Sequence, residues 1–347
     1  MRKGYILISV CLCMFHFARG QRSSFINKIG DWFHTENDTA YIEDHTKDLT
    51  TRLVGSRKYN LYDIVDRKRK TEVMYRPNTP FNVGFGFNYK FIGINVVFNL
   101  PVINSTDKYG KTKALDLQAH YYLRKLVVDF YGQRYKGYYI ANSRGLLNGF
   151  DEKGPLPVRP DIRNLNIGMS VEYVFNDKKF SYRAAYLQNE YQKKSAGSFL
   201  IGGELFTARM KGDSSLIPHN ITNQDFIDGI TYSATSIFSA AANAGYAYTF
   251  VYKQHFFLTL SLSGSFGGNY TRLFRDDAND LRKFGVQLNN TVRASFGYNS
   301  SKYFAGIHYV NLTTRSQSPI EHSWQTIGAG NFRISLARRF GLKRQLF

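Results

Sequence analysis

The stretch from Tyr232 to Tyr270 alternates between two kinds of side chain over its whole length. One parity carries aromatic and aliphatic residues, the other carries mostly small or polar residues, and a polar break at 252–255 divides the stretch in two. A period of two is that of an extended strand, so the pattern predicts two long strands joined by a tight turn. In a soluble sheet the apolar face would pack on a core. In a membrane barrel it would face lipid, and the polar face would line the lumen.

The same alternation recurs from Phe81 to Phe340 in segments separated by turns or loops. A tilted strand of roughly ten residues is long enough to cross a bilayer. The sequence therefore predicts an all-β fold, an antiparallel transmembrane β-barrel of about twelve strands (roughly 10–14). A weaker strand near Thr51 is left out of this count. The expected strands are 81–89, 92–100, 115–123, 126–133, 164–175, 180–189, 199–205, 232–250, 256–270, 284–298, 303–309 and 332–340.

Three features favour a membrane barrel over a soluble sheet. Aromatic residues on the apolar parity gather near strand ends, as Phe81 and Tyr89 do, which is typical of aromatic girdles. The opposite parity is small or polar, where a soluble sheet would expose longer Lys and Glu side chains. Charges of both signs occur on that polar parity, so they could pair inside a lumen. Beyond residue 20 no apolar run is long enough to span a bilayer as a helix, so an integral membrane form would have to be a barrel.

The N-terminus has the pattern of a secretory signal peptide over residues 1–20, with cleavage expected before Gln21. Both cysteines, Cys11 and Cys13, lie in this segment, so the exported chain would carry no disulfide, thiolate metal site or cysteine nucleophile. We expect a periplasmic N-terminal arm at 21–71, a barrel at 72–347, and a location in the cell outer membrane.

The formal net charge is +20, and the chain stays strongly basic after the expected loss of Arg2, Lys3 and Arg19. Such a charge often indicates nucleic acid, but an export signal argues against that partner. The expected anionic partners are outer-membrane lipid and anionic envelope glycolipid, and a small solute is a further candidate. The barrel-assembly machinery is another expected partner, because outer-membrane barrels often end in an aromatic residue such as Phe340 or Phe347.

An even number of strands places both ends of the chain on the periplasmic side, where turns should be short. The turns at 252–255 and 299–302 agree with this expectation, and the long loop at 210–232 then lies outside. In the first half the same count places the tight turns at 89–91 and 123–125 on the outer side. The conflict indicates either an unusual first half or a miscount by one strand.

Several short runs resemble a known family. They are Tyr75–Asn78, Gly84–Lys90, Tyr109–Thr112, Asp129–Tyr131, Tyr135–Ile140 and Gln192–Ser198, and together they resemble the DUF4421 family of Bacteroidota. The resemblance covers most of the chain from about Thr39 onward. It implies an exported, barrel-like protein with no assigned activity, so it transfers no catalytic residue.

Charged residues on the inward parity form the candidate site. They would either line a polar path for a solute or pair with one another and plug a narrow lumen, because buried charges need partners in both cases. The candidates are Asp116, Asp129, Glu172, Arg183, Glu204, Arg293 and Arg333.

Other motifs give no chemistry. Tyr109–Thr112 ends like a phosphate-binding loop, but the upstream glycine is missing and a strand follows instead of a helix. The histidines lack metal-site spacing, so we expect no metal and no cofactor. Three functions stay open: a narrow channel or transporter for small solutes, a plugged structural or envelope-maintenance barrel, and an outer-membrane enzyme acting on lipid. A non-enzymatic role is expected, with no catalytic residue assigned.

Overall fold

The computed structural model describes residues 36–342, apart from 90–91, 101–105 and 152. The expected signal peptide and its cleavage site lie outside the described residues. From Asn37 onward the chain forms one compact unit, and almost all of its regular structure is antiparallel strand. No helix in the described part of the chain is long and apolar enough to cross a membrane.

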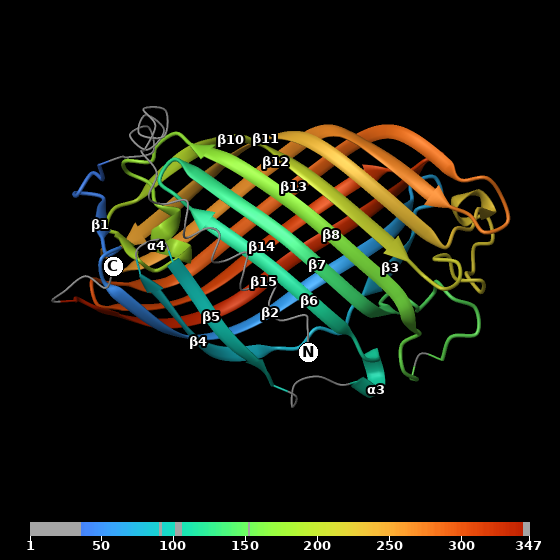
Figure 1. Ribbon diagram of the computed structural model, residues 1–347, viewed down its shortest axis with the longest axis horizontal. Helices are drawn as coiled ribbons and strands as arrows, with labels where there is room; N and C mark the ends of the chain where they lie inside the picture. Colours follow the sequence, from blue (N-terminus) through green and yellow to red (C-terminus); the bar gives the residue numbers. More distant parts are fainter. Residues whose placement is uncertain (1–35, 90–91, 101–105, 152, 343–347) are drawn as a thin grey trace, which may run out of the picture. The chain divides into compact units, whose positions relative to one another are not determined.

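Ten of the described strands form a closed ring (Figure 1). The ring closes where the last strand, β15, pairs with β2 from Phe340↔Leu49 to Ser323↔Asp66. All neighbours around the ring are antiparallel. Its members are β2 (Leu49–Asp66), β3 (Thr71–Arg76), β7 (Leu126–Ile140), β8 (Val158–Val174), β10 (Ala196–Lys211), β11 (Ala234–Tyr252), β12 (Phe256–Phe274), β13 (Leu281–Asn299), β14 (Tyr303–Gln317) and β15 (Ser323–Phe340).

Three further strands lie outside the ring, namely β4 (Asn82–Tyr89), β5 (Ile92–Asn99) and β6 (Lys113–Tyr122), and a short helix, α3 (Thr106–Tyr109), precedes β6. β4 pairs with the first half of β2, and β5 pairs with β4. β6 pairs with β7. No pairing joins β5 to β6 among their described residues. Between β2 and β7 the wall is therefore closed by β3 near one end and is split between β5 and β6 toward the other.

The two ends of the barrel differ in their connections. The short-turn end carries the turns at 123–125, 253–255 and 300–302, and the long-loop end carries 141–157, 212–233 and 275–280. The tight turn after Tyr252 takes left-handed backbone at Lys253 and Gln254, as a narrow hairpin with twisted strands requires.

The expected count of about twelve strands is not confirmed, because ten of the described strands form the ring and three lie outside it, and this difference removes the conflict over turns. β2 belongs to the ring, although the segment up to residue 71 was assigned to an arm. Residues 182–186, expected within a strand, form the helix α4 (Tyr182–Tyr186), because Ser181 caps its first turn. With both changes, the end of β4 at Tyr89 and the turn at 123–125 lie at the short-turn end.

The alternation seen in the sequence becomes an outer face and a lumen face. In β12 the outward Leu262 and Phe266 are 60% and 67% exposed, whereas the inward Thr259 and Ser263 are at most 1% exposed. The predicted assignment of the polar parity to the lumen is therefore confirmed. This arrangement is the reverse of a soluble sheet, which hides its apolar face.

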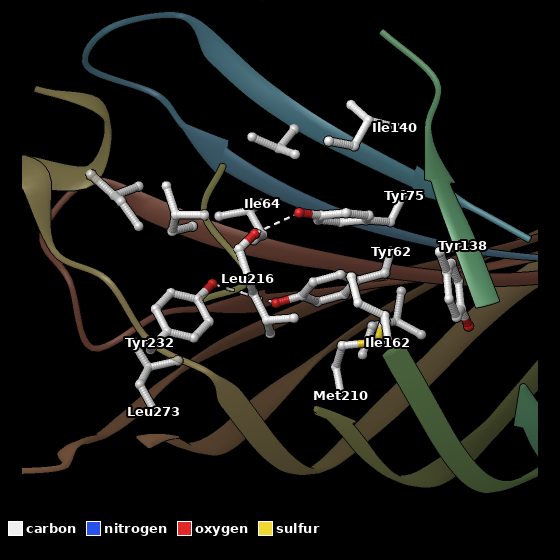
Figure 2. Packing of buried hydrophobic residues seen from close by; sticks show 14 of the residues in the cluster. Tyr62, Ile64, Tyr75, Tyr138, Ile140, Ile162, Met210, Leu216, Tyr232 and Leu273 are labelled. Atoms are coloured by element: carbon white, nitrogen blue, oxygen red, sulfur yellow. Dashed lines mark hydrogen bonds between the residues drawn. The ribbon is translucent and has the colours of Figure 1, made fainter. Parts of the chain in front are cut away.

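The long-loop half of the lumen is filled by packed tyrosine and aliphatic side chains. Figure 2 shows Tyr62 and Tyr75 pointing into this cluster with Ile162 and Met210 beside them. The Tyr75 hydroxyl donates to the carbonyl of Leu216 at 2.6 Å, so the loop 212–233 is tied to the strands below it. These packed side chains occupy this half of the lumen.

Candidate functional site

Within the short-turn half of the barrel, the segment between β8 and β10 turns into the lumen instead of forming a hairpin. It contains α4 and then β9 (Glu190–Gln192), and β9 pairs with β1 (Ile42–Asp44). The Ser181 hydroxyl accepts from the backbone N–H of Ala184 at 3.0 Å and begins the helix. A plug made of this chain therefore occupies the lumen at the short-turn end (Figure 1).

Aromatic stacking holds α4 against the wall. The ring of Tyr122 on β6 stacks on Tyr182 and Tyr186 of α4, with centroids 5.7 and 5.4 Å apart. The Tyr182 hydroxyl lies 2.7 Å from the Ser261 hydroxyl on the opposite wall. The helix therefore bridges the lumen from β6 to β12.

At the short-turn end of the barrel, Glu190 forms ion pairs with two arginines, Arg124 and Arg183. Its carboxylate lies 3.1 Å from Arg124 and 3.4 Å from Arg183. The guanidinium of Arg339 donates to the Gln188 and Glu190 carbonyls. Burial lowers the pKa of the Arg124 guanidinium, and the charge of Glu190 partly offsets this by favouring the charged form. These contacts anchor the plug to the turns beneath it.

Three of the predicted lumen charges meet in one buried cluster. Arg293 on β13 reaches across the lumen and pairs with Asp129 on β7 and, at 3.0 Å, with Glu172 on β8. All three side chains are at most 2% exposed. His120 on β6 contacts the other oxygen of Asp129 at 2.6 Å. This cross-lumen cluster is the paired arrangement that the sequence analysis weighed against a solute path.

The other four predicted charges have their hydrogen-bond or ion-pair partners outside that cluster, although Glu204 is close enough to Glu172 and Arg293 to interact electrostatically with them. Asp116 accepts from Gln133 at 2.8 Å, and Glu204 accepts from Asn289. Arg183 pairs with Glu190, as described above. Arg333 donates to the carbonyl of Tyr186 at 2.8 Å, at the end of α4. The seven charges therefore form one central cluster and several local contacts rather than a single network.

A cavity of about 440 Å³ lies between α4 and the wall made by β2, β4, β14 and β15. It extends to the unpaired edges of β5 and β6, where Asn95 and the run from Gln118 to Leu123 line it. The lining contains three arginines and two histidines but no carboxylate. The complete lining is Arg52, Asn88, Asn95, Gln118, Ala119, His120, Tyr121, Tyr122, Leu123, Arg183, Tyr186, Leu187, Asn189, His308, Val310, Asn331 and Arg333.

Arg52, His308 and Arg333 are close enough to interact electrostatically with one another. Within the described part of the chain, neither Arg52 nor Arg333 forms an ion pair with a carboxylate; Arg52 instead donates to amide oxygens, including Gln188 at 2.6 Å. The buried Nε2 of His308 and Nε of Arg333 have no hydrogen-bond partner among the described residues. Such groups are usually satisfied when buried.

Sequence reasoning missed Arg52, His120 and His308 as members of one site. Arg52 fell in a segment assigned to an arm, and the two histidines were set aside for lacking metal-site spacing. The signal that would have found Arg52 and His308 is their inward parity in β2 and β14. Among the described residues, no group of three or more His, Cys, Asp or Glu side chains could hold a metal ion.

His308 and Ser295 face each other on neighbouring strands, with the Ser295 hydroxyl 2.9 Å from Nδ1. Ser295 is 1% exposed. A nucleophile must reach its substrate, and this hydroxyl is buried in the wall of the lumen. The pair therefore orients the His308 ring and leaves Nε2 directed away from Ser295.

Comparisons with solved structures return barrels with little likeness to this chain. The outer membrane protease OmpT from Escherichia coli has 7% identity and a TM-score of 0.36, covering 86% of this chain and 98% of that one. OmpT of Vibrio cholerae, an outer membrane protein in trimer form, has 11% identity and a TM-score of 0.27, covering 84% and 99%. The toluene transporter TodX of Pseudomonas putida has 7% identity and a TM-score of 0.22, covering 85% and 90%.

The architecture is therefore taken from the strand pairing itself and not from these likenesses. No curated protein matches the sequence. The family model described as "Domain of unknown function (DUF4421)" matches residues 36–340, which include every strand described above. This match confirms the resemblance found in the sequence, and the chain belongs to the DUF4421 family.

Proposed function

We propose that this chain is an outer-membrane barrel whose lumen is closed along its axis, with a structural or binding role rather than that of an open channel. The proposed membrane location is supported by the polarity of the barrel wall, which has apolar side chains outside and polar side chains inside. Leucine and phenylalanine side chains cover the outside of β12, and threonine and serine side chains are buried inside. Lipid is the environment in which such an outer face is stable.

Axial closure is supported by what fills the lumen. The tyrosine and aliphatic cluster occupies the long-loop half, the cross-lumen cluster of Arg293 occupies the middle, and α4 occupies the short-turn end. These contents favour the plugged alternative over the narrow channel for small solutes.

The long strands support the proposed outer-membrane location, because the 19 residues of β12 exceed the roughly ten that a strand needs to cross a bilayer.

Membrane fractionation tests the location. The full chain should be recovered in the outer-membrane fraction, and its folded form should migrate differently from the boiled form on a gel. Recovery as a soluble periplasmic protein would overturn the proposed location.

Planar-bilayer recording tests axial closure. The purified full chain should produce no stepwise conductance above leak, while an open porin reconstituted in the same way should. Reproducible unitary conductance from the full chain would restore the channel hypothesis.

The lipid-modifying alternative is the weaker one for this geometry, because the Ser295–His308 pair is buried. We propose a non-enzymatic role. Release of fatty acid from phospholipid by the purified chain, lost in Ser295→Ala, would overturn it.

A further inference from the structure

We propose that the cavity beside α4 binds a single-chain anionic amphiphile, a fatty-acid carboxylate, which reaches it sideways between β5 and β6. The inference rests on the proposed membrane location, because only then does this gap open toward lipid. It adds to that function a ligand class, a binding site and a route of access.

The gap is defined by strand pairing. β5 pairs only with β4, and β6 pairs only with β7, so the facing edges of β5 and β6 have no strand partner among the described residues. Unpaired edges in contact with lipid would leave backbone N–H and C=O groups unsatisfied, at a cost of several kcal/mol per group. The split is therefore the place in the described wall where a ligand could pass between the lumen and the outer face.

The cavity reaches the gap through β6. Residues of both parities from this strand line it, including the inward His120 and the outward Ala119 and Tyr121. Asn95 on β5 lines the same cavity, so the cavity lies along the gap between the two strands. Tyr121 is 57% exposed, so β6 carries a residue that belongs to the cavity lining and also faces the outside.

The charge of the cavity selects an anion. Arg52, Arg183 and Arg333 line it, and no carboxylate does. Arg183 is paired with Glu190, but neither Arg52 nor Arg333 pairs with a carboxylate in the part of the chain that the structure describes. A buried cation without a counter-charge is costly, and a guanidinium recognises carboxylate in a planar, bidentate manner. A bound carboxylate would supply the missing charge.

The partnerless nitrogens mark where that carboxylate would bind. His308 is 2% exposed, and its Nδ1 is hydrogen-bonded to the Ser295 hydroxyl. Its buried Nε2 has no partner among the described residues, so this nitrogen can donate to a ligand. The buried Nε of Arg333 also has no partner among the described residues. Both belong to the cavity lining, together with apolar groups such as Leu187 and Val310.

The size of the cavity limits the ligand. About 440 Å³ lies near the lower end of the range for small-molecule pockets, which is roughly 300–1,000 Å³. It can hold one headgroup and part of one chain, with the rest leaving through the gap along the exposed Tyr121 and Leu123. A glycolipid with several chains does not fit this space.

Equilibrium dialysis of the purified full chain in an uncharged maltoside detergent tests the proposal, with protein-free micelles as the blank. Radiolabelled oleate should show a saturable component of about one per chain, whereas oleyl alcohol and acetate should show none. Equal binding of oleyl alcohol would overturn the cationic headgroup site. Equal binding of acetate would overturn the acyl chain and its sideways route.

Substitutions place the ligand in the cavity. Arg333→Gln and Arg52→Gln should each weaken oleate binding at least tenfold, while Arg338→Gln, in the same strand as Arg333 but on the outer face, should leave it unchanged. Each variant is first checked for the gel shift of the folded barrel. Because Arg52 also holds Asn88 and Gln188, Arg333→Gln is the deciding variant if Arg52→Gln does not fold. Unchanged binding by folded Arg333→Gln would overturn the site.

Ala119→Trp tests the route. A large side chain at this outward position on β6 should slow oleate uptake several-fold, whereas Ala294→Trp on the outer face of β13 should not. Equal rates in both variants would overturn access between β5 and β6. The assay uses purified protein, so its failure would leave the proposed membrane location to be decided by fractionation.

Discussion

The two halves of the lumen are filled in different ways. The long-loop half is a dense cluster in which Tyr62, Tyr75 and Ile162 are fully buried, and the Tyr62 and Tyr75 hydroxyls bond to a neighbouring strand and to the loop above. The short-turn half holds a charged cluster, a helix and a cavity of about 440 Å³, and the described residues that line this cavity include three arginines and no carboxylate. Dense packing in the long-loop half favours a permanent closure of the lumen there. Open space and arginines without a counter-charge in the short-turn half favour the binding of an anionic ligand.

The largest effect should come from the charged cluster. Arg293→Met leaves Asp129 and Glu172 buried without their cation, so the free energy of unfolding should fall by about 3–5 kcal/mol. Urea unfolding of the refolded barrel in detergent measures this. Adding Asp129→Asn and Glu172→Gln should recover much of the loss.

Arg338→Met is the matched control for Arg293→Met. This arginine lies on the outer face over the rings of Tyr303 and Phe340, so its loss should cost less than about 1 kcal/mol. Equal losses in the two variants would mean that the cluster does not hold the lumen together.

The next effect compares packing in the two halves. Ile162→Ala should lower the free energy of unfolding by about 2–5 kcal/mol, because the dense half cannot relax to fill the space. Leu187→Ala should cost about half as much or less, since Leu187 already borders the cavity. If Leu187→Ala is as costly as Ile162→Ala, the contrast between a packed half and an open half fails.

A smaller effect should come from the bond that ties the loop to the dense half. Tyr75→Phe removes the donor to the Leu216 carbonyl and leaves that oxygen without its partner, which should cost about 1–3 kcal/mol. Limited proteolysis should then cut the loop 212–233 faster, with Tyr303→Phe on the outer face as the control. Unchanged cutting would show that this bond does not hold the loop.

The smallest effect should lie in the loop at 275–280. The hydrogen bond from Arg272 is the main cause that holds the pKa of Asp280 below its usual value. A depressed carboxyl pKa stabilises the fold above the unfolded value, near 3.9, and the contribution is lost as pH falls through the folded value. Asp280→Asn should flatten the dependence of the unfolding midpoint on pH in this acidic window, and Asp277→Asn should not. Identical profiles for the two variants would contradict this assignment.

The wall could be predicted wherever alternation was regular. Leu258, Leu260 and Leu262 were assigned to the outer face from parity alone, and they are exposed there. The same reasoning placed Asp129, Glu172 and Arg293 in the lumen, where they are buried. Parity predicts a face because successive side chains of a strand point in opposite directions.

The plug could not be predicted in the same way. Phe180 to Tyr186 alternate like a strand, yet Ser181 caps a helix there whose aromatic residues stack on Tyr122. Residues 49–66 were assigned to an arm, but they form β2, which pairs with β15 and closes the ring. Both misassignments arise because a local pattern does not show the partner that a segment finds elsewhere in the chain.

By itself the sequence determined the fold class, the face of most strands and the family, and it placed the candidate charges on the lumen face without deciding whether they pair or line a path. Only the tertiary structure decided that the ring has ten strands among the described residues, that the wall splits between β5 and β6, and that arginines without carboxylates meet at one cavity. The reason is physical. Alternation is a property of neighbouring residues, whereas closure, a missing pairing and a missing counter-charge depend on strands far apart in the chain.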